Sequence, residues 1–467
     1  MEGRISMPAT PTAKLTTKIK LAYGSGDLGF ALTDAMIGVL YAIFLVDVVG
    51  MAPTLAAAAI FIGRSSDYIN DPLVGYITDR TRSRWGRRRP YLLFGAIPFA
   101  IAFGLLWWQP PLASQVALAV YYGLAYVFYD LAASFVYMPY YALTPELSDD
   151  YDERTSLTSY RMFYSIVGSM IAFIVPLAVI GVMAPESTNT ILAVGIAMGL
   201  ISAVPLILVF FATHERLEFQ HMKQPGLKES LGAAFRNKPF LFSLGIFLFS
   251  FGALEIMQSM LLFFLRYRMN LEEQSDLIAG CLFGAALLSL PFWNWLSGRW
   301  DKRVAYISGM LFLGLVMTSI IFIPPDWGLT PVMVIAALAG VGFGAVQVLP
   351  WSMLPDAIEW DELSTGNRHE GMFYSLVTLF RKMASSLTIP LTLLVLGWTG
   401  YVANAPDQPA AAMTGIQVMM GPVPAALLLV GVVFAWFYPL NRKRFESLRA
   451  ELAQKRSEPS PTPGVDQ

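Results

Sequence analysis

The chain has 467 residues, of which 55% are hydrophobic and only 14% are charged, and its formal net charge is −1. Soluble domains carry roughly a quarter charged residues, so this composition excludes an ordinary soluble protein. Cys281 is the only cysteine, which excludes a disulfide within the chain, and we expect no cofactor and no nucleic-acid partner.

Apolar stretches of about 20 residues follow one another along the chain, and each is long enough to cross a bilayer as a helix. They are too long and too evenly spread for one buried soluble core. The sequence therefore predicts an all-α membrane protein with twelve transmembrane helices, at 22–46, 54–78, 91–109, 114–143, 157–183, 189–212, 240–265, 275–298, 304–324, 330–354, 371–399 and 416–439.

The basic residues are distributed unevenly between the segments that join these stretches. Clusters follow the second stretch, occupy the segment after the sixth and close the chain, whereas the opposite side carries only Arg266 and Arg268. Because basic loops stay in the cytoplasm, this bias predicts that both termini are cytoplasmic. Residues 1–19 are polar, so we expect no cleavable signal peptide.

The apolar stretches and the polar segments between them also predict how the chain is organised. We expect a cytoplasmic tail at 1–19, six-helix halves at 20–213 and 239–440, a central cytoplasmic loop at 214–238 and a partly disordered cytoplasmic tail at 441–467. One chain of twelve spans encloses a complete pathway, so we expect a monomer in the lipid bilayer.

The second apolar stretch carries three charged side chains. Asp67 and Asp71 are four residues apart and Arg64 precedes Asp67 by three, so all three share one face of a helix. A charge near the bilayer centre costs about 2.5–3.5 kcal/mol even on insertion scales, so three charges together need a reason. Two interpretations are open: a structural ion pair between Arg64 and one aspartate, or a site at which a transporter binds its driving cation.

The two halves repeat short patterns after corresponding stretches. Gly75–Arg80 after the second stretch resembles Gly298–Arg303 after the eighth, and Thr144–Glu146 after the fourth resembles Leu354–Asp356 after the tenth. We expect these patterns to lie in loops. Repeated six-helix halves are the arrangement of the major facilitator fold, with the substrate site between the halves near the midplane.

Charged residues within the first of these repeats are candidates for cytoplasmic latches: Asp79, Arg80, Asp301 and Arg303. An aspartate directly after a span can accept hydrogen bonds at a neighbouring helix N-terminus or pair with an arginine. Such contacts would stabilise an outward-open state and break when the inner side opens. The alternative is that the basic residues only anchor the topology.

Several motifs resemble one family, the glycoside–pentoside–hexuronide:cation symporters, to which melibiose permease belongs. The likeness covers about residues 20–440 and implies the major facilitator fold in a bacterial inner membrane. The motifs are Lys20–Asp27, Asp47–Gly50, Arg64–Pro72 with its Asn-Asp-Pro, Thr81–Gly86, Met138–Pro145, Tyr160–Arg161, Asp356–Glu362 and Arg381–Lys382.

The resemblance implies a cation site. In that family the paired aspartates of the second helix bind the coupling cation, which implies this role for Asp67 and Asp71. Asn70 and, on the fourth helix, Ser134 stand at the positions that complete the oxygen shell. A small hard cation takes several oxygen ligands, whereas a proton needs only one carboxylate with a raised pKa. Retention of Asn70 and Ser134 favours sodium as the metal ion, with a proton as the alternative.

The chain departs from melibiose permease at two sugar-binding positions. The carboxylates of the first and fourth helices are replaced by Ala31 and Tyr137, and Tyr137 is kept as a candidate substrate-binding residue. Asp34 lies three residues after Ala31 on the same helix face and is the candidate replacement, with a contact to a neighbouring helix as the alternative. We assign a structural role to Asp27, which lies nearer the cytoplasmic end.

Four further substrate candidates follow from the resemblance. Arg161 on the fifth helix and Lys382 on the eleventh are intramembrane cations in both proteins, and Tyr141 takes an aromatic position on the fourth. Gln347 replaces an aromatic residue on the tenth. Arg161 has enough donors to join the cation site to a sugar hydroxyl. Charge balance against Asp67 and Asp71 is the alternative role of the two cations.

These features predict a secondary active transporter in which sodium or proton binding is coupled to symport of a sugar or glycoside by alternating access. Because both sugar-binding acids are changed while Arg161, Arg381 and Lys382 are present, an anionic uronide, a sulfonated sugar or a lysolipid is the alternative substrate. A non-transporting membrane sugar sensor has no need of the cation residues, which are all present. The spans contain no phosphate-binding loop and no nucleophile constellation, so we expect neither an ATP-driven pump nor an enzyme.

Overall fold

A computed structural model describes residues 15–148, 151–215, 234–365 and 370–457, and every regular element in these ranges is a helix. Most of the predicted N-terminal tail and central loop and the end of the C-terminal tail lie outside the described residues. Before the central loop the elements are α1 (Thr17–Gly24), α2 (Gly26–Met36), η1 (Ile37–Tyr41), η2 (Phe44–Val48), α3 (Pro53–Ser65), α4 (Asp67–Arg80), α5 (Arg89–Leu106), α6 (Gln115–Leu147), α7 (Tyr151–Ile180), η3 (Pro185–Ser187) and α8 (Thr188–Ala212). After it they are α10 (Lys238–Phe263), η5 (Phe264–Arg268), η6 (Glu272–Gln274), α11 (Ser275–Arg299), α12 (Lys302–Ser319), η7 (Ile320–Phe322), α13 (Leu329–Thr365), α14 (Glu370–Trp398), α15 (Ala410–Met420), α16 (Pro422–Trp436) and α17 (Arg442–Ser457).

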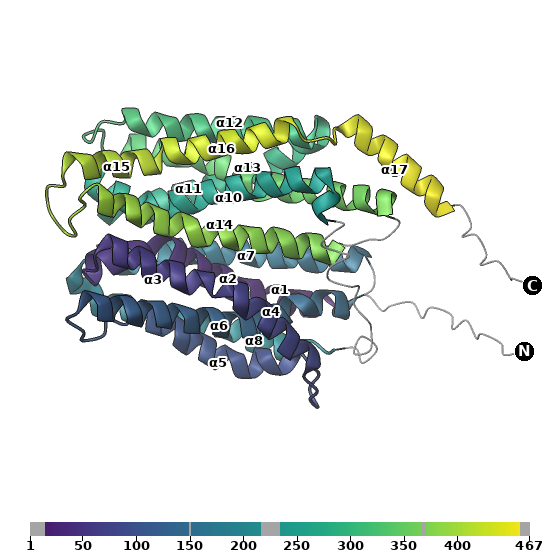
Figure 1. The fold of residues 1–467 in the computed structure, drawn as a ribbon, viewed down its shortest axis with the longest axis horizontal. Coiled ribbons are helices and arrows are strands. Elements are labelled where there is room, and N and C mark those ends of the chain that lie inside the picture. Colours follow the sequence, from purple (N-terminus) through teal and green to yellow (C-terminus); the bar gives the residue numbers. More distant parts are fainter. Residues whose placement is uncertain (1–14, 149–150, 216–233, 366–369, 458–467) are drawn as a thin grey trace, which may run out of the picture. The chain divides into compact units, whose positions relative to one another are not determined.

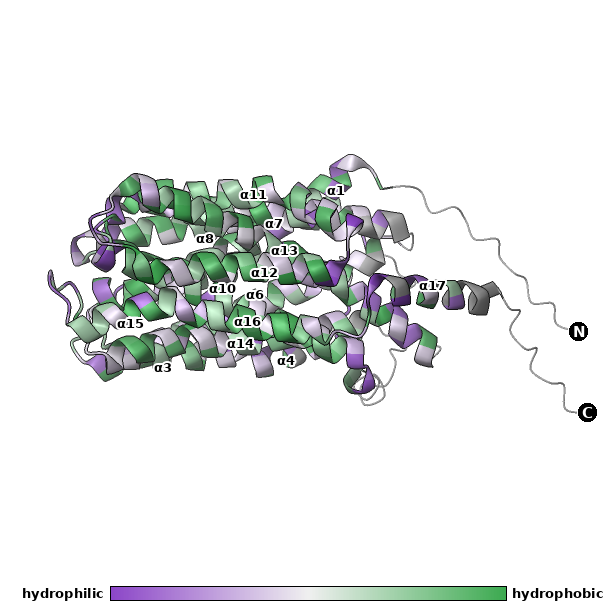
Figure 2. Ribbon diagram, turned by 90° about the horizontal axis from the view of Figure 1, so that it is seen from above, coloured by the Kyte–Doolittle hydropathy of each residue, from purple (hydrophilic) through white to green (hydrophobic). Residues whose placement is uncertain are grey.

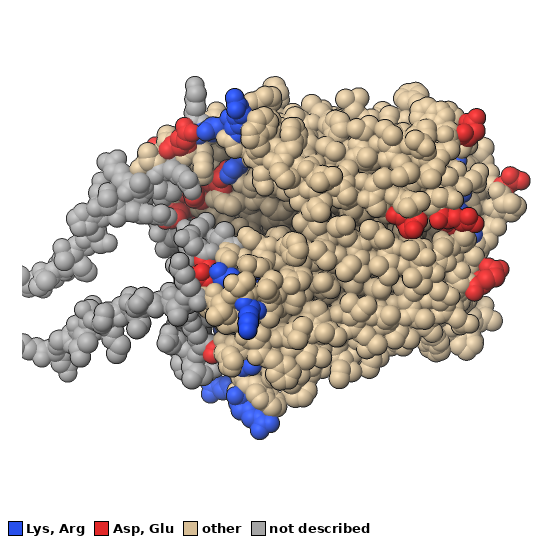
Figure 3. Space-filling view, turned by 180° about the vertical axis from the view of Figure 1, so that it is seen from behind, with Lys and Arg blue, Asp and Glu red and all other residues tan. Residues whose placement is uncertain are grey.

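In the described residues, ten helical segments are long and apolar enough to cross a membrane, and they coincide with the third to the twelfth predicted stretches. Figure 2 shows hydrophobic residues along the length of α12 and α16, whereas α17 is largely hydrophilic. On the face drawn in Figure 3, charged side chains lie toward the helix ends and are sparse between them. This is the hydropathy pattern expected of helices in a bilayer.

The first two predicted stretches are each built from shorter helices in succession. The breaks fall at Ser25, between α1 and α2, and at Ser66, between α3 and α4. Both hydroxyls donate to a carbonyl oxygen three residues earlier, on Ala22 and Gly63, over 2.7 Å. Such bonds compete with the helical ladder and bend the helix, and the π-turns η1 and η2 widen the first segment further.

Three of the four repeated patterns lie in helices, so the expectation that they are loops is wrong. Gly75–Arg80 closes α4, Thr144–Glu146 lies near the end of α6, and Leu354–Asp356 lies inside α13. Only Gly298–Arg303 spans a turn, between α11 and α12. The reason is that hydropathy marks where a helix becomes polar, and α6 and α13 continue as helices beyond that point.

The chain divides into two compact units. Unit 1 comprises 1–37 and 62–222, and unit 2 comprises 38–61 and 223–467. Residues 38–61 therefore cluster with unit 2, although they precede most of unit 1 in the sequence. The boundaries of the two six-helix halves stay a prediction.

Close contacts between helices build the core of unit 1, where α2 packs against α7 and α8 (Figure 1). Gly168 of α7 lies against the Leu28 carbonyl oxygen and Gly29 of α2 against that of Ser202, so closely that a Cβ at either glycine would collide with the oxygen. In lipid, helices associate through close packing, and small residues permit it. In unit 2, α11 packs along α13, and α10 along α14 and α16.

Gly168→Ala is expected to lower the free energy of unfolding by about 1–3 kcal/mol, because the added methyl group forces α7 away from α2. The midpoint of thermal unfolding of the purified chain in detergent checks this. Gly75→Ala is the matched control, since nothing lies within 4 Å of the position of its Cβ and alanine favours the helix. Equal midpoints for the two variants would show that the close approach of α2 and α7 is not required.

Candidate cation and substrate site

The N-terminal half of α4 brings a predicted cation residue, Asp71, against α6. The hydroxyl of Ser134, 5% exposed on α6, donates to Oδ1 of Asp71 over 2.7 Å. Asp67 lies one turn earlier on the same face, and both aspartates are half-buried. Among the described residues no three Asp, Glu, His or Cys side chains gather to hold a metal ion, so a cation here needs neutral oxygens in addition.

Asn70 lies on the same turn and contacts an acidic residue that the sequence analysis missed. Its Nδ2 donates to Oδ2 of Asp130 over 3.0 Å and to Oγ of Ser66 over 3.1 Å. The Ser66 hydroxyl also lies 2.9 Å from the same Asp130 oxygen. Asp130 is 7% exposed and precedes Ser134 by one turn of α6. An acidic side chain in the middle of an apolar stretch is the signal that would have identified it.

Arg64 and Asp34 join this polar region of unit 1. Arg64, 7% exposed near the end of α3, donates from Nε to the Tyr126 hydroxyl over 2.9 Å. Asp34 and Asp130 both lie close enough to Tyr126 to interact with it electrostatically. Asp34, the candidate replacement for the lost sugar acid, is half-buried on α2.

Arg161 pairs with a carboxylate from the first helical segment. Its Nε lies 2.7 Å from Oδ2 of Asp27, which is 3% exposed, and its Nη1 donates to Thr144 over 3.4 Å. The guanidinium lies 4.6 Å from the centre of the Tyr141 ring. The charge of Arg161 is therefore balanced by Asp27, a residue that the sequence analysis assigned to structure.

An aromatic group made by Phe30, Tyr137 and Tyr141 lies beside this pair. The ring centres are 4.7 Å apart for Phe30–Tyr137 and 6.2 Å for each of the other two pairs. Tyr137 is 4% exposed, and its hydroxyl has no hydrogen-bond partner in the described part of the chain. A buried hydroxyl without a hydrogen-bond partner costs free energy, so a ligand group that bonds the Tyr137 hydroxyl would be favoured at this position.

The remaining substrate candidates belong to unit 2. Gln347 is exposed on α13, and Lys382 is half-buried on α14. Its neighbour Arg381 is also half-buried and lies 5.2 Å from the centre of the Phe251 ring. A substrate site that uses residues of both units stays a prediction.

The predicted latch residues have local partners. Arg80 stacks on Tyr76, whose ring centre lies 3.8 Å from the guanidinium carbon, and Arg303 lies 5.6 Å from the ring centre of Trp436. Asp301 caps α12 by accepting from the Arg303 backbone N–H over 2.8 Å, and it accepts from the backbone N–H of Arg442 over 2.9 Å. The side chain of Asp79 lies outside the described residues. The latch role stays a prediction.

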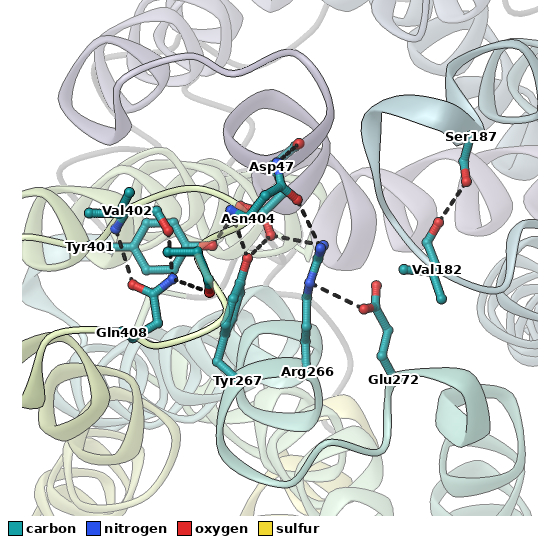
Figure 4. Close-up of polar contacts among 11 residues, drawn as sticks. Asp47, Val182, Ser187, Arg266, Tyr267, Glu272, Tyr401, Val402, Asn404 and Gln408 are labelled. Atoms are coloured by element: carbon teal, nitrogen blue, oxygen red, sulfur yellow. Dashed lines mark hydrogen bonds and ion pairs between the residues drawn. The ribbon is translucent and has the colours of Figure 1, made fainter.

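A polar cluster around Asp47 in unit 2 joins residues that the sequence analysis did not connect (Figure 4). Asp47, on η2, is completely buried and accepts from the hydroxyls of Tyr401 over 2.5 Å and Tyr267 over 2.7 Å. Nη1 of Arg266 lies 3.1 Å from the same carboxylate. The Asp47–Gly50 motif and Arg266 were both noted in the sequence, but nothing in the sequence joined them.

Asn404 and Glu272 complete the cluster. Asn404 donates from Nδ2 to the Asp47 carbonyl oxygen over 2.6 Å and accepts from Nη2 of Arg266 over 2.8 Å (Figure 4). Glu272 lies 3.2 Å from Nε of the same arginine. Burial, with the Asp47 carboxylate, raises the pKa of Tyr401 well above its ordinary value, so this hydroxyl stays a donor. The segment 38–61 is thereby tied to the ends of the α10 and α14 segments.

The all-helical architecture of the described residues, with charged side chains inside apolar helices, is that of a polytopic membrane protein. The family described as MFS/sugar transport protein matches residues 22–442, so the chain belongs to this family. The match to a family of transporters makes it a transporter and not an enzyme. The predicted all-α major facilitator fold is confirmed by this match. The structure of this chain is also similar to that of a D-xylose–proton symporter, with a TM-score of 0.65 and 16% identity. The similarity covers 90% of this chain and 97% of that chain.

Relatives of the chain carry different substrate names. An uncharacterized symporter of Synechocystis sp. is 32% identical, over 94% of this chain and 97% of its own length. The sodium-dependent lysophosphatidylcholine symporter 1-A of Danio rerio is 26% identical, over 92% of this chain and 87% of its own. The glucuronide carrier protein homolog of Escherichia coli is 27% identical, over 95% and 97% respectively. The chain is a multi-pass membrane transporter of a symporter family.

Proposed function

We propose that the protein is a sodium-coupled symporter of a neutral sugar or glycoside that works by alternating access. The observation that carries the coupling is the contact between Ser134 and Asp71 over 2.7 Å, which joins a hydroxyl of α6 to a carboxylate of α4. A hydroxyl that donates to a carboxylate can rotate and offer its lone pairs to a cation. With Asp67 and Asn70 on the same turn, this gives the several oxygens that a hard cation prefers.

Sodium is favoured over a proton for two reasons. A proton needs one carboxylate, whereas this turn also supplies a hydroxyl and an amide. In addition, one relative is named a sodium-dependent symporter. We further propose that the protein acts as a monomer in the bacterial inner membrane with both termini in the cytoplasm, in agreement with the distribution of its basic residues.

The substrate side of the proposal rests on Tyr137, Tyr141 and Asp34. Aromatic rings pack against the apolar face of a pyranose, and a buried hydroxyl without a partner is suited to a sugar hydroxyl. Tyr137 has such a hydroxyl in the described part of the chain, and Asp34 lies close enough to interact with it electrostatically. Arg161 then serves this site indirectly, because Asp27 balances its charge at 2.7 Å.

An anionic substrate, either a uronide or a lysolipid, is the second candidate. The names of two relatives favour it, as do the half-buried cations Arg381 and Lys382 on α14. The ion pair of Arg161 with Asp27 argues against it, since a neutralised guanidinium is a weaker anion receptor. A sulfonated sugar belongs to the same candidate.

Uptake into vesicles that contain the purified chain tests the proposal. Labelled neutral glycosides, uronides and a lysophospholipid are offered under an imposed sodium or proton gradient. We expect a neutral glycoside to accumulate under the sodium gradient, and Tyr137→Phe to raise its KM about tenfold, which corresponds to one lost hydrogen bond of about 1.4 kcal/mol.

Tyr121→Phe is a matched control for substrate binding, because Tyr121 lies on the same helix as Tyr137 and its hydroxyl already donates to the Leu105 carbonyl oxygen over 2.9 Å. It should leave the KM for the substrate unchanged. Accumulation of only the uronide or the lysophospholipid would transfer the proposal to the anionic candidate. No accumulation under either gradient would favour a non-transporting sugar sensor.

A further inference from the structure

Asp130 is a buried acid that no part of the proposed cation site yet uses. It lies on α6 at 7% exposure, and one of its oxygens, Oδ2, lies within hydrogen-bond distance of both Ser66 and Asn70. These two residues flank Asp67 in sequence, at the junction of α3 and α4. Asp130 therefore contacts the segment that carries the cation residues.

The hydrogen bonds of Asn70 fix which end of its amide is available. Its two Nδ2 protons are directed to Asp130 at 3.0 Å and to Ser66 at 3.1 Å, so both donors are used. Its Oδ1 makes no hydrogen bond in the described part of the chain, although the residue is only 8% exposed. An amide flip would place a donor where the oxygen now lies and would leave Asp130 facing an acceptor.

We propose that Asp130 is a positioning residue that holds the Asn70 amide with its oxygen free for the coupling cation. The inference rests on the proposed cation-coupled function. Ser66 belongs to the same arrangement, since its hydroxyl accepts from Asn70 and lies 2.9 Å from Asp130. Asp130 acts through Asn70, and the carboxylates of Asp67 and Asp71 supply the charge that binds the ion.

Positioning and direct charge predict different results for two variants of Asp130. Asparagine keeps a carbonyl oxygen that can accept from Asn70, whereas leucine of similar size removes the acceptor. If Asp130 only orients the amide, Asp130→Asn keeps the cation affinity within about threefold of the wild type. Asp130→Leu then allows the amide to flip and raises the sodium concentration for half-saturation about tenfold, the ratio that one hydrogen bond provides.

Sodium titration of the purified full chain measures this without a substrate. Sodium chloride is added at constant ionic strength, with choline as the replacement cation, and the rise in the thermal unfolding midpoint gives half-saturation. Loss of affinity in Asp130→Leu with retention in Asp130→Asn supports the proposal. Wild-type affinity in Asp130→Leu overturns it, and equal loss in both variants overturns it in favour of a charge effect.

A double-mutant cycle with Asn70→Ala distinguishes an effect of Asp130 through Asn70 from a general effect of the substitution on the fold. In that background Asp130→Leu should cause no further loss of sodium affinity, because the amide it positions is already absent. Additive losses overturn the positioning role. Asp130→Ser, whose short side chain cannot reach Asn70, replaces leucine if that variant does not fold. If sodium does not raise the unfolding midpoint of the wild type, both the sodium coupling and this inference are overturned. If the wild type responds to sodium and Asp130→Leu has the same sodium affinity, only the inference is overturned.

Discussion

Asp71→Asn is expected to abolish sodium-driven accumulation of the substrate. The substitution keeps the size of the side chain and an oxygen near Ser134, which lies 2.7 Å from Asp71 Oδ1, but removes the negative charge. For unit charges about 4 Å apart at an effective dielectric constant of about 20, the lost attraction is about 4 kcal/mol, or about three decades in cation affinity. At ordinary sodium concentrations the site is then empty.

The measurement is accumulation against a gradient in vesicles, together with sodium binding by thermal shift. Ser134→Ala is the graded comparison, because it removes one neutral ligand and is expected to weaken sodium binding only about tenfold. Asp71→Glu keeps the charge and should retain part of the activity. Unchanged sodium-driven accumulation in Asp71→Asn would exclude Asp71 from the cation site.

Long-range pairing of polar residues is what the sequence could not provide. Ten spans could be read directly, because uninterrupted apolar helices have a hydropathy signal of the right length. The first two segments carry more charged residues than most of the others, and each is broken into shorter helices at a serine, Ser25 or Ser66, whose hydroxyl bonds a carbonyl oxygen of its own helix. A serine in an apolar stretch does not show by itself whether it bonds its own helix or a neighbour.

The candidate site was predicted only in part, because the sequence shows local spacing but not contacts between distant residues. The i, i+4 spacing of Asp67 and Asp71 is local, so a helix places both on one face. The partners of Arg161 and Asn70 are not local: Asp27 precedes Arg161 by 134 positions, and Asp130 follows Asn70 by 60. The resemblance to a known family carried over Ser134, whereas Asp130 stands at a position to which that resemblance assigned no role.

Asp47→Asn is expected to destabilise unit 2 by about 3 kcal/mol. The carboxylate is completely buried and holds Arg266 at 3.1 Å together with two tyrosine hydroxyls. Removing one partner of a buried ion pair costs about 3–5 kcal/mol, and the low end applies because Glu272 remains near the arginine. Asp326→Asn is the matched control, because Asp326 is exposed in the turn before α13. The thermal unfolding midpoint should fall for Asp47→Asn alone.

The same substitution should also alter transport, because the Asp47 cluster ties residues 38–61 to the ends of α10 and α14. Any conformation in which this segment leaves unit 2 must break these contacts, so their loss raises the population of that conformation. A loss of about 3 kcal/mol shifts such an equilibrium about a hundredfold. We therefore expect Asp47→Asn to lower the rate of accumulation at least tenfold while its sodium half-saturation in the thermal titration stays near that of the wild type. A wild-type accumulation rate together with a lowered midpoint would show that the cluster only stabilises the fold and does not control the conformational cycle.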